Sequence, residues 1–296
     1  MPSRAQWTGS TYGCLRVRST VFSAAMAPAK RRRFALMGLA APTHGSISIL
    51  GMRQPVDKLA ILQRTGFVGE KKQLFDAMKG RDLAKFNRPF FPRWSDSLVA
   101  KYERQLEIPM DVQFKKLSQG NRTKLCLLMA LAQGAELLIL DEPTLGLDPV
   151  VMDALLKVVI EDYAGEGRTI FLSSHNLAEV EKVADWVGII HEGKLLLEAS
   201  LEDIRADYRR ITASGNSLPT ARTPQIFSVN AAGGTSEYFV RNGAELFAAE
   251  LRNHGASILE ISPLNLEQVF LQLVRKEESC TSGNSGATPV AVSSSI

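Results

Sequence analysis

FKKLSQGNRTKLCLLMALAQGAELLILDEPTLGLDPVVMDALLKVVIEDYAGEGRTIFLSSH, residues 114–175, is the stretch that decides the fold. Residues 137–140 form a short apolar run, which is typical of a buried strand in a parallel sheet. Asp141 and Glu142 follow directly, where that strand is expected to end. Ligands of open α/β sheets bind beyond the carboxyl ends of the strands, so these two carboxylates can hold Mg²⁺ and activate a water molecule.

A second apolar strand is expected over residues 169–172, after a turn at residues 143–149 and a helix from about Val150. Ser173, Ser174 and His175 follow this strand. Two neighbouring parallel strands end at the same edge of a sheet. The sequence therefore predicts that a carboxylate pair and a histidine lie in one place.

Four motifs in this stretch resemble those of the ATP-binding cassette (ABC) ATPases. LLILDEP is similar to the Walker B strand, LSQGN to the signature loop, LGLDP to the D-loop and SSH to the switch histidine. One such motif is a weak signal, but four in the family's order within about sixty residues are specific. The resemblance runs from about Phe34 to Tyr208 and is to the exporter-type ATPase subunits of ABC transporters.

The resemblance implies both a fold and a function. The implied fold is α/β: a three-layer P-loop NTPase core of the ABC type with a helical subdomain and a small α+β C-terminal domain. The implied function is to bind and hydrolyse ATP with Mg²⁺ and so to power substrate movement through separate transmembrane permease subunits. A homo- or heterodimer of ATPase subunits, cytoplasmic and peripheral on the inner face of the cell membrane, is implied as well.

The family's site residues fall on positions of this chain that match its motifs. Asp141 would hold Mg²⁺ through water, Glu142 would accept a proton from the attacking water, and His175 would contact the γ-phosphate. The other matched positions would complete the ATP site of the opposite subunit or couple the two sites across the dimer: Ser118, Gln119 and Gly120 in the signature loop, and Asp148 in the D-loop.

Two positions depart from the family pattern. Glu70 stands in the Q-loop, where many members have Gln; either side chain can ligate Mg²⁺ or a water through oxygen, but Glu adds a charge. A plain surface glutamate is the alternative interpretation. Gln119 replaces the first of two usual glycines. Ser118 taken alone would be an ordinary N-cap serine, and its place just before the Walker B strand favours the signature-loop role.

The glycine-rich phosphate loop, GxxxxGK[ST], cannot be read in this chain. In that loop, backbone N–H groups and a lysine hold the ATP phosphates. Lys30 stands at the matching position and is our candidate nucleotide-binding lysine, but Ala27, Pro28 and Ala29 precede it. The glycines that permit close backbone approach are therefore absent, and Pro28 has no N–H.

The genetic code suggests a reason for this difference. When the reading frame is moved back by one base, each new codon takes its last two bases from the first two of an existing codon. Those fixed pairs allow residues 20–33 to be read in the displaced frame as GLLGRNGAGKTTT, which resembles an intact phosphate loop. We hypothesise a frame slip over at least this segment. The alternative is that freedom of codon choice produced the match.

Composition divides the rest of the chain. Residues 1–33 show no strand or helix pattern and are expected to be aberrant and disordered, and residues 276–296 are expected to form a disordered tail. Between them we expect the ABC ATPase domain at residues 34–211, a linker rich in Ser, Thr, Pro and Gly at residues 212–224, and the α+β domain at residues 225–275.

Within the ATPase domain, residues of about 77–133 are expected to form the helical subdomain. Its aromatic residues Phe86, Phe90, Phe91 and Trp94 could contact the membrane partner, although packing inside the subdomain is the commoner fate of such side chains. The acidic residues that follow His175 are expected on a solvated helix face: Glu179, Glu181 and Asp185. His191 is expected in a turn, without a catalytic role.

Composition sets limits on partners and compartment. The net charge of +4 could suit anionic lipid headgroups, but no basic block with interleaved aromatic residues supports nucleic-acid binding. Cys14, Cys126 and Cys280 lack metal-site spacing and indicate a reducing compartment. No apolar run is long enough to span a membrane.

Two other functions stay open from the sequence. One is a catalytically impaired pseudo-ATPase, a regulatory subunit that supplies only its signature loop to a competent partner. The other is a soluble ABC protein acting on ribosomes or DNA, but such proteins usually have two cassettes or long coiled-coil insertions, and neither is present. The transported substrate cannot be read, because the membrane subunit selects it.

Overall fold

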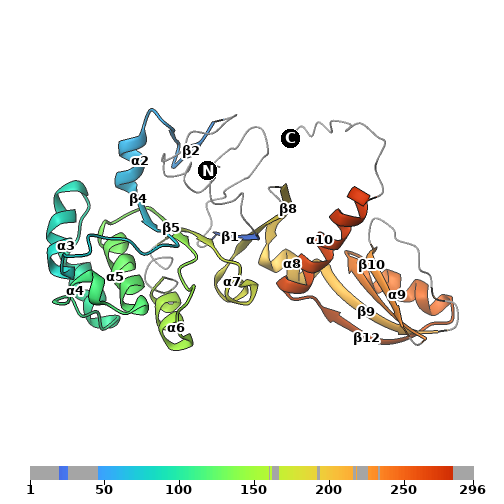
Figure 1. The fold of residues 1–296 in the computed structure, drawn as a ribbon. Helices are drawn as coiled ribbons and strands as arrows, with labels where there is room; N and C mark the ends of the chain where they lie inside the picture. Colours follow the sequence, from blue (N-terminus) through green and yellow to red (C-terminus); the bar gives the residue numbers. More distant parts are fainter. Residues whose placement is uncertain are drawn as a thin grey trace. The chain divides into compact units, whose positions relative to one another are not determined.

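The structure is a computed structural model of the chain. It describes residues 20–25, 46–159, 161, 167–191, 194–215, 218, 226–232 and 234–282. The chain divides into two compact units, the first ending at Leu201 and the second beginning at Glu202 (Figure 1). Each unit is described by itself.

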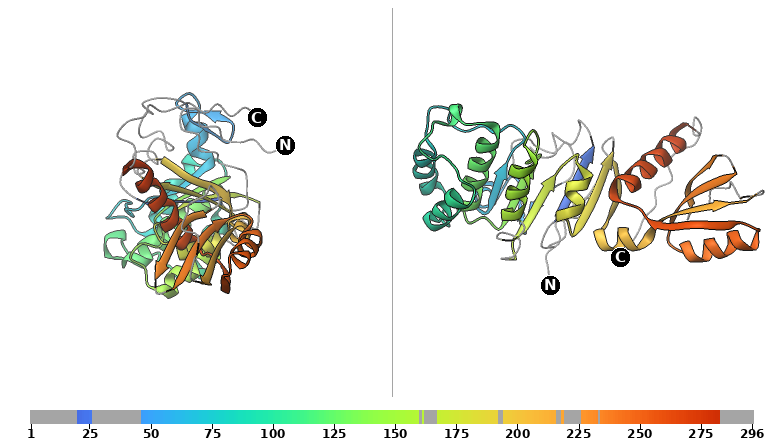
Figure 2. Two further views of the ribbon diagram at one scale, coloured as in Figure 1. Left: turned by 90° about the vertical axis from the view of Figure 1, so that its right-hand side faces the viewer. Right: turned by 90° about the horizontal axis from the view of Figure 1, so that it is seen from below.

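The first unit is built on a six-stranded sheet with the order β4-β5-β6-β1-β7-β8. The strands are β1 (Thr20–Ala25), β4 (Thr65–Val68), β5 (Leu137–Asp141), β6 (Thr169–Ser173), β7 (Trp186–His191) and β8 (Lys194–Ser200). All neighbouring pairs are parallel except β7 and β8, which are antiparallel. Figure 2 shows the blue β1 among the yellow strands that follow it much later in the sequence.

The strand that precedes the predicted carboxylate pair lies inside this sheet. All five residues of β5 are buried, which explains why they form a continuous apolar run rather than an alternating pattern. β5 pairs with β4 on one side and with β6 on the other, and Asp141 lies opposite Ser173. The two strands predicted from sequence therefore end level with each other.

The helices of the first unit include the predicted helical subdomain. α3 (Gly80–Asn87), η1 (Arg88–Phe90), α4 (Asp96–Gln105), η2 (Phe114–Lys116) and α5 (Gln119–Ala132) lie between β4 and β5 in the sequence. The second half of α5 is buried almost all round, as expected for a helix enclosed by α3, α4 and β4. The remaining elements are the hairpin β2 (Ser48–Ile49) and β3 (Met52–Arg53) and the helices α2 (Lys58–Arg64), α6 (Pro149–Lys157) and α7 (Leu177–Val183).

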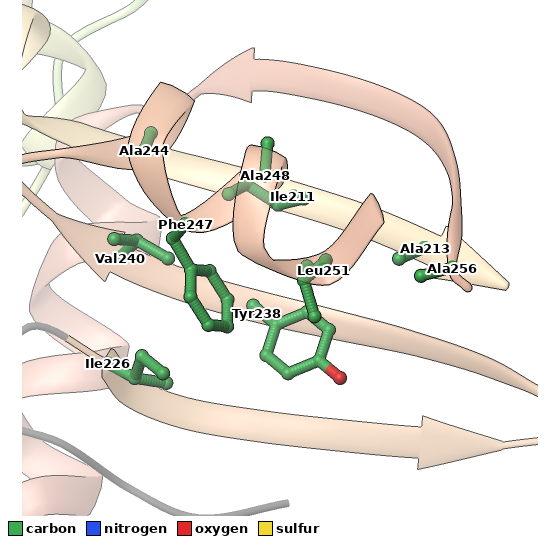
Figure 3. Packing of buried hydrophobic residues seen from close by; sticks show 10 residues of the cluster. All are labelled: Ile211, Ala213, Ile226, Tyr238, Val240, Ala244, Phe247, Ala248, Leu251 and Ala256. Atoms are coloured by element: carbon green, nitrogen blue, oxygen red, sulfur yellow. The ribbon is translucent and has the colours of Figure 1, made fainter. Parts of the chain in front are cut away.

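The second unit is a four-stranded antiparallel sheet with the order β10-β11-β9-β12. Its elements are α8 (Leu201–Asp207), β9 (Tyr208–Ser214), β10 (Ile226–Ala232), β11 (Thr235–Arg241), α9 (Ala244–Asn253), β12 (Ser257–Pro263) and α10 (Leu266–Ser282). Figure 3 shows Phe247 and Leu251 of α9 packed toward Tyr238 of the sheet, and the rings of Phe247 and Tyr238 are edge-to-face with centroids 5.1 Å apart. This α+β arrangement has its own apolar core.

The division of the chain differs from the predicted one in three places. Thr20–Ala25 is a strand in the middle of the first sheet, although residues 1–33 were expected to lack regular structure. β9 runs across the predicted boundary at residue 211, so the linker-like stretch 212–224 falls largely between two strands of the second unit. α10 continues to Ser282, into the predicted tail. Residues 283–296 lie outside the described residues.

Within the described ranges, no helix is both long enough and apolar enough to cross a membrane.

Candidate functional site

The site lies where β5 and β6 end. Asp141 is the last residue of β5 and only 8% exposed, and Ser173 Oγ donates a hydrogen bond of 2.8 Å to its Oδ1. A buried carboxylate needs such a donor to offset the loss of water. The bond fixes one oxygen of Asp141 at the sheet edge. The sequence predicts Ser173 at the end of its strand but does not predict this hydrogen bond.

Glu142 has an unusual backbone conformation. Its φ is +46°, in the left-handed region that residues with a Cβ adopt at a cost of about 1–3 kcal/mol. Hydrogen bonds hold it there from both sides: its N–H donates to Ser173 O at 3.0 Å, and its carbonyl oxygen accepts from Lys72 Nζ at 3.3 Å. The backbone that presents this carboxylate is therefore tied to the neighbouring strand and to the loop after β4.

Glu142 and His175 are in direct contact. Glu142 Oε2 lies 2.8 Å from His175 Nδ1, across a separation of 33 residues. The Glu142 side chain is 12% exposed and that of His175 is 62% exposed, so the pair has a covered carboxylate and an accessible imidazole. This geometry confirms the expectation that the two strand ends bring a carboxylate pair and a histidine together. It suits proton transfer to or from a water molecule near Glu142.

Lys72 is a site residue that sequence reasoning missed. Its Nζ donates to Gly69 O at 2.7 Å as well as to Glu142 O. Burial lowers the pKa of Lys72 to about 8, against the nearby negative charges of Glu142 and Glu70. Burial also raises the pKa of the Cys126 thiol to about 11. No sequence signal marks Lys72, because lysines in loops are ordinarily solvated.

The oxygen donors at this edge suit a magnesium ion. No group of three or more His, Cys, Asp or Glu side chains that could hold a metal occurs in the part of the chain that the structure describes. Mg²⁺ in phosphate-handling sites usually has one or two protein carboxylates and takes its other oxygens from water and substrate phosphates. Asp141 meets that requirement. Glu70 follows β4 by two residues, and Val68 at the end of β4 lies opposite Leu140 of β5, so Glu70 follows a neighbouring strand at the same edge.

The predicted signature loop and D-loop contact each other. Ser118 is the N-cap of α5 and its Oγ accepts a hydrogen bond of 3.3 Å from Asn121 N, while Gln119 Nε2 donates to Leu145 O at 3.2 Å. A Cβ on Gly146, whose φ is +73°, would lie 2.8 Å from Gln119 Nε2. The glutamine that replaces a usual glycine therefore binds the neighbouring loop.

Gly120 and Asp148 lie in the same two loops. Gly120 lies beside Val151 of α6. A Cβ added to Gly120 would be 3.5 Å from Val151 Cγ1. Asp148 is the N-cap of α6, and its Oδ1 accepts hydrogen bonds from Val150 N at 3.1 Å and Val151 N at 3.0 Å. Ser118 and Asp148 thus have capping roles here, and their roles toward a second subunit remain predictions.

Two expectations for the segment after His175 are wrong. Glu179 was expected on a solvated face, but it is 7% exposed and its two carboxylate oxygens accept hydrogen bonds from Thr144 and Asn176. α7 has only seven residues and three nearby acidic side chains, so the sequence offers no way to tell which one points inward. His191 is the last residue of β7 rather than part of a turn.

Lys30, the candidate phosphate-binding lysine, lies outside the described residues. The structure does describe β1, which ends at Ala25. β1 is parallel to β6, and Phe22 lies opposite Ser173. β1 therefore ends at the same edge of the sheet as β5 and β6, where Asp141 and Glu142 are found.

Known proteins resemble this chain in both sequence and structure. A family model described as "AAA domain, putative AbiEii toxin, Type IV TA system" matches residues 59–181. The Nod factor export ATP-binding protein I of Neorhizobium galegae is 31% identical over 261 residues, which cover 82% of this chain and 72% of that protein. The bacitracin transport ATP-binding protein BcrA of Bacillus licheniformis is 35% identical over 180 residues, covering 59% of this chain and 58% of that protein.

Among solved structures, a dimeric ATP-binding cassette in a post-hydrolysis state, bound to ADP and Pi, superposes with a TM-score of 0.56. It shares 14% sequence identity, and the superposition covers 68% of this chain and 99% of that chain. The likeness is in fold, and the expected three-layer P-loop NTPase core of the ABC type is confirmed.

Proposed function

Because this chain belongs to the ATP-binding proteins of ABC transporters, we propose that it hydrolyses ATP and thereby drives a transport cycle. The proposed site is the edge of the sheet where Asp141, Glu142 and His175 lie. The observation that supports this most directly is the 2.8 Å contact between Glu142 Oε2 and His175 Nδ1 beside the buried Asp141. ATP hydrolysis depends mainly on positioning and charge stabilisation, and this edge offers both.

Each residue of the edge has a distinct part in this proposal. Glu142 accepts a proton from the attacking water, since it is the carboxylate adjacent to the metal-holding residue, and His175 holds Glu142 in place and contacts the γ-phosphate from its exposed side. Asp141 would hold Mg²⁺, with Glu70 as a further oxygen donor. When bound, Mg²⁺ neutralises charge on the phosphate oxygens.

A second subunit would complete the site. Ser118 and Gly120 open the N-terminus of α5, where a hydroxyl and backbone N–H groups favour an anion such as a γ-phosphate. The dimer described for the solved ATP-binding cassette supports this arrangement. We propose a homo- or heterodimer in which Asp148 and Gln119 couple the two sites.

The partner is a transmembrane permease, and the transport direction is export. The proposed direction follows the Nod factor relative, which is an export protein. For the contact surface, we favour an aromatic group on the helical subdomain: Phe75, Phe86 and Phe90 are 57%, 44% and 56% exposed, with adjacent ring centroids 5.1 and 5.5 Å apart. Exposed clusters of this kind mark protein or membrane contacts. In this role the protein is cytoplasmic and peripheral on the membrane.

The alternatives weighed from the sequence gain no support. The relatives named above are transport and export proteins, and none is named as a regulatory subunit or as a protein of ribosomes or DNA.

The experiment is a Glu142→Gln substitution, measured by ATP titration and phosphate release. It is made in the chain itself and in a variant whose residues 21–33 read GLLGRNGAGKTTT, called here the phosphate-loop variant. The substituted protein should bind ATP, and its turnover should fall by about 100-fold or more if Glu142 is the general base. Glu136→Gln, one residue before the other end of the same strand, is the control for a loss of stability away from the site. Unchanged turnover in Glu142→Gln would refute the assignment.

A further inference from the structure

Glu179 is a buried carboxylate held by two segments of the site. Thr144 Oγ1 donates to Glu179 Oε2 at 2.5 Å, and Asn176 Nδ2 donates to Glu179 Oε1 at 2.7 Å. Thr144 is 8% exposed and Glu179 is 7% exposed. A carboxylate removed from water in this way is stable only while its donors stay in place, so the three side chains form a coupled unit.

The two residues that donate to Glu179 are close in sequence to the two proposed catalytic residues. Asn176 directly follows His175, and Thr144 follows Glu142 with only Pro143 between them. The proline ring fixes its own φ, so the link from Thr144 to Glu142 has little freedom. We therefore expect a shift between Thr144 and Asn176 to change the separation of Glu142 and His175.

We infer that Glu179 is a positioning residue that sets the contact between Glu142 and His175 by joining the segments on which they stand. The inference rests on the proposed function for its catalytic consequence, but the geometric link stands without it. Glu179 also makes a local bond, in which its N–H donates to Oδ1 of the N-cap residue Asn176 at 3.4 Å.

The test uses the full chain and nuclear magnetic resonance of His175. The chain has four histidines, and the imidazole signals of His175 are identified by their loss in His175→Gln. In Glu179→Gln and in Thr144→Val these signals should move, because the separation from Glu142 changes. Thr144→Ser keeps the hydroxyl and should leave them in place. Glu181→Gln, two residues along α7, is the matched control.

A second readout separates positioning from stability. In the phosphate-loop variant, Glu179→Gln and Thr144→Val should lower kcat by roughly 10-fold to 100-fold, the loss expected for a misplacement of about 1 Å, with little change in KM for ATP. Thr144→Ser should restore kcat.

The outcomes are distinguishable. His175 signals that stay unmoved in both Glu179→Gln and Thr144→Val, with the fold intact, overturn the inference, even if thermal stability falls. If Glu179→Gln does not fold, Thr144→Val alone decides. If the His175 signals move as expected but Glu142→Gln retains turnover, the positioning link holds and the proposed general base is wrong.

Discussion

Lys72 Nζ donates to the carbonyl oxygen of Glu142, so the loop after β4 supports the residue that carries the proposed general base. The same ammonium group also donates to Gly69 O, one residue before Glu70. A single side chain therefore connects the predicted Q-loop to the turn after β5. The loss of this side chain has a measurable consequence for stability.

Lys72→Met should change the pH dependence of stability. The pKa of Lys72 is about 8 in the folded chain, against an ordinary 10.5, so the unfolded chain binds a proton that the folded chain has released between these values. The contribution of Lys72 to the free energy of unfolding therefore rises with pH from about 8 to 10.5. Denaturant titrations across this range should show that rise reduced in Lys72→Met.

The buried thiol of Cys126 also titrates in this pH range, so its effect must be eliminated from the comparison of the two proteins. The pKa of Cys126 is raised from 9.0 to about 11. Its contribution to the free energy of unfolding therefore falls as pH rises from 9.0 to about 11, which is opposite to the contribution of Lys72. Both proteins should therefore be measured with Cys126→Ala as background. An unchanged pH slope in Lys72→Met would mean that Lys72 is not desolvated in solution.

Glu136→Gln should lower the stability at neutral pH and make it less sensitive to acid. Glu136 accepts from Arg64 at 2.7 and 2.6 Å and from Arg93 at 2.5 Å. Chiefly because of its hydrogen bond with Arg64, the pKa of Glu136 is lowered from 4.5 to about 2. Its contribution is present above pH 4.5 and is lost as pH falls toward 2.

The measurement for this cluster is urea unfolding from pH 5 to pH 2. The parent should lose more stability over that range than Glu136→Gln, and Glu103→Gln is the control in an exposed ion pair with Arg81. Equal acid sensitivity of the parent and Glu136→Gln would contradict the prediction.

Gly146→Ala should disturb the contact between the two loops. An alanine at φ +73° costs about 1–2 kcal/mol of backbone strain, and its Cβ would displace the Gln119 amide from Leu145 O. Gly51→Ala is the matched control, because Gly51 has φ +78° and no heavy atom within 4 Å of an added Cβ.

The difference between the two glycine variants isolates the loop contact. Both should lose stability by the strain term, which thermal unfolding measures. Only Gly146→Ala should also lower ATP turnover in the phosphate-loop variant. If both variants have the same turnover, the hydrogen bond from Gln119 has no role in coupling.

Restoring the phosphate loop should tighten ATP binding. Ala27, Pro28 and Ala29 offer fewer N–H groups than the glycine loop, and each hydrogen bond lost to a charged group costs about 1.5–3 kcal/mol, or about tenfold or more in Kd. ATP titration of the two forms at low and moderate salt is the measurement, together with sequencing of the source DNA across codons 20–34. Equal affinity would show that the phosphates are held elsewhere.

Much of the site could be predicted because its residues follow strands in order. The apolar runs that became β5 and β6, with Asp141, Glu142 and His175 directly after them, fix which side chains meet at the sheet edge. The contact of Thr144 with Glu179 could not be predicted in this way. It joins the turn after β5 to helix α7, between residues 35 positions apart whose side-chain types are common on surfaces.

The boundary between the units was misplaced for a related reason. β9 contains Arg209, Arg210, Thr212 and Ser214, and its sequence resembles a polar connection. It is nevertheless a strand because β11 and β12 pair with it on both sides, and because its Ile211 and Ala213 are buried in the apolar core of the second unit.

The position of β1 has a consequence for the order in which the chain can fold during synthesis. β1 leaves the ribosome early, yet Thr20 pairs with Phe171 on one side and Trp186 on the other. The middle of the first sheet cannot be completed until β7 has emerged, because β1 lies between β6 and β7. A nascent chain stalled before β7 should therefore be sensitive to protease throughout, and a few added residues that release β7 should protect it abruptly.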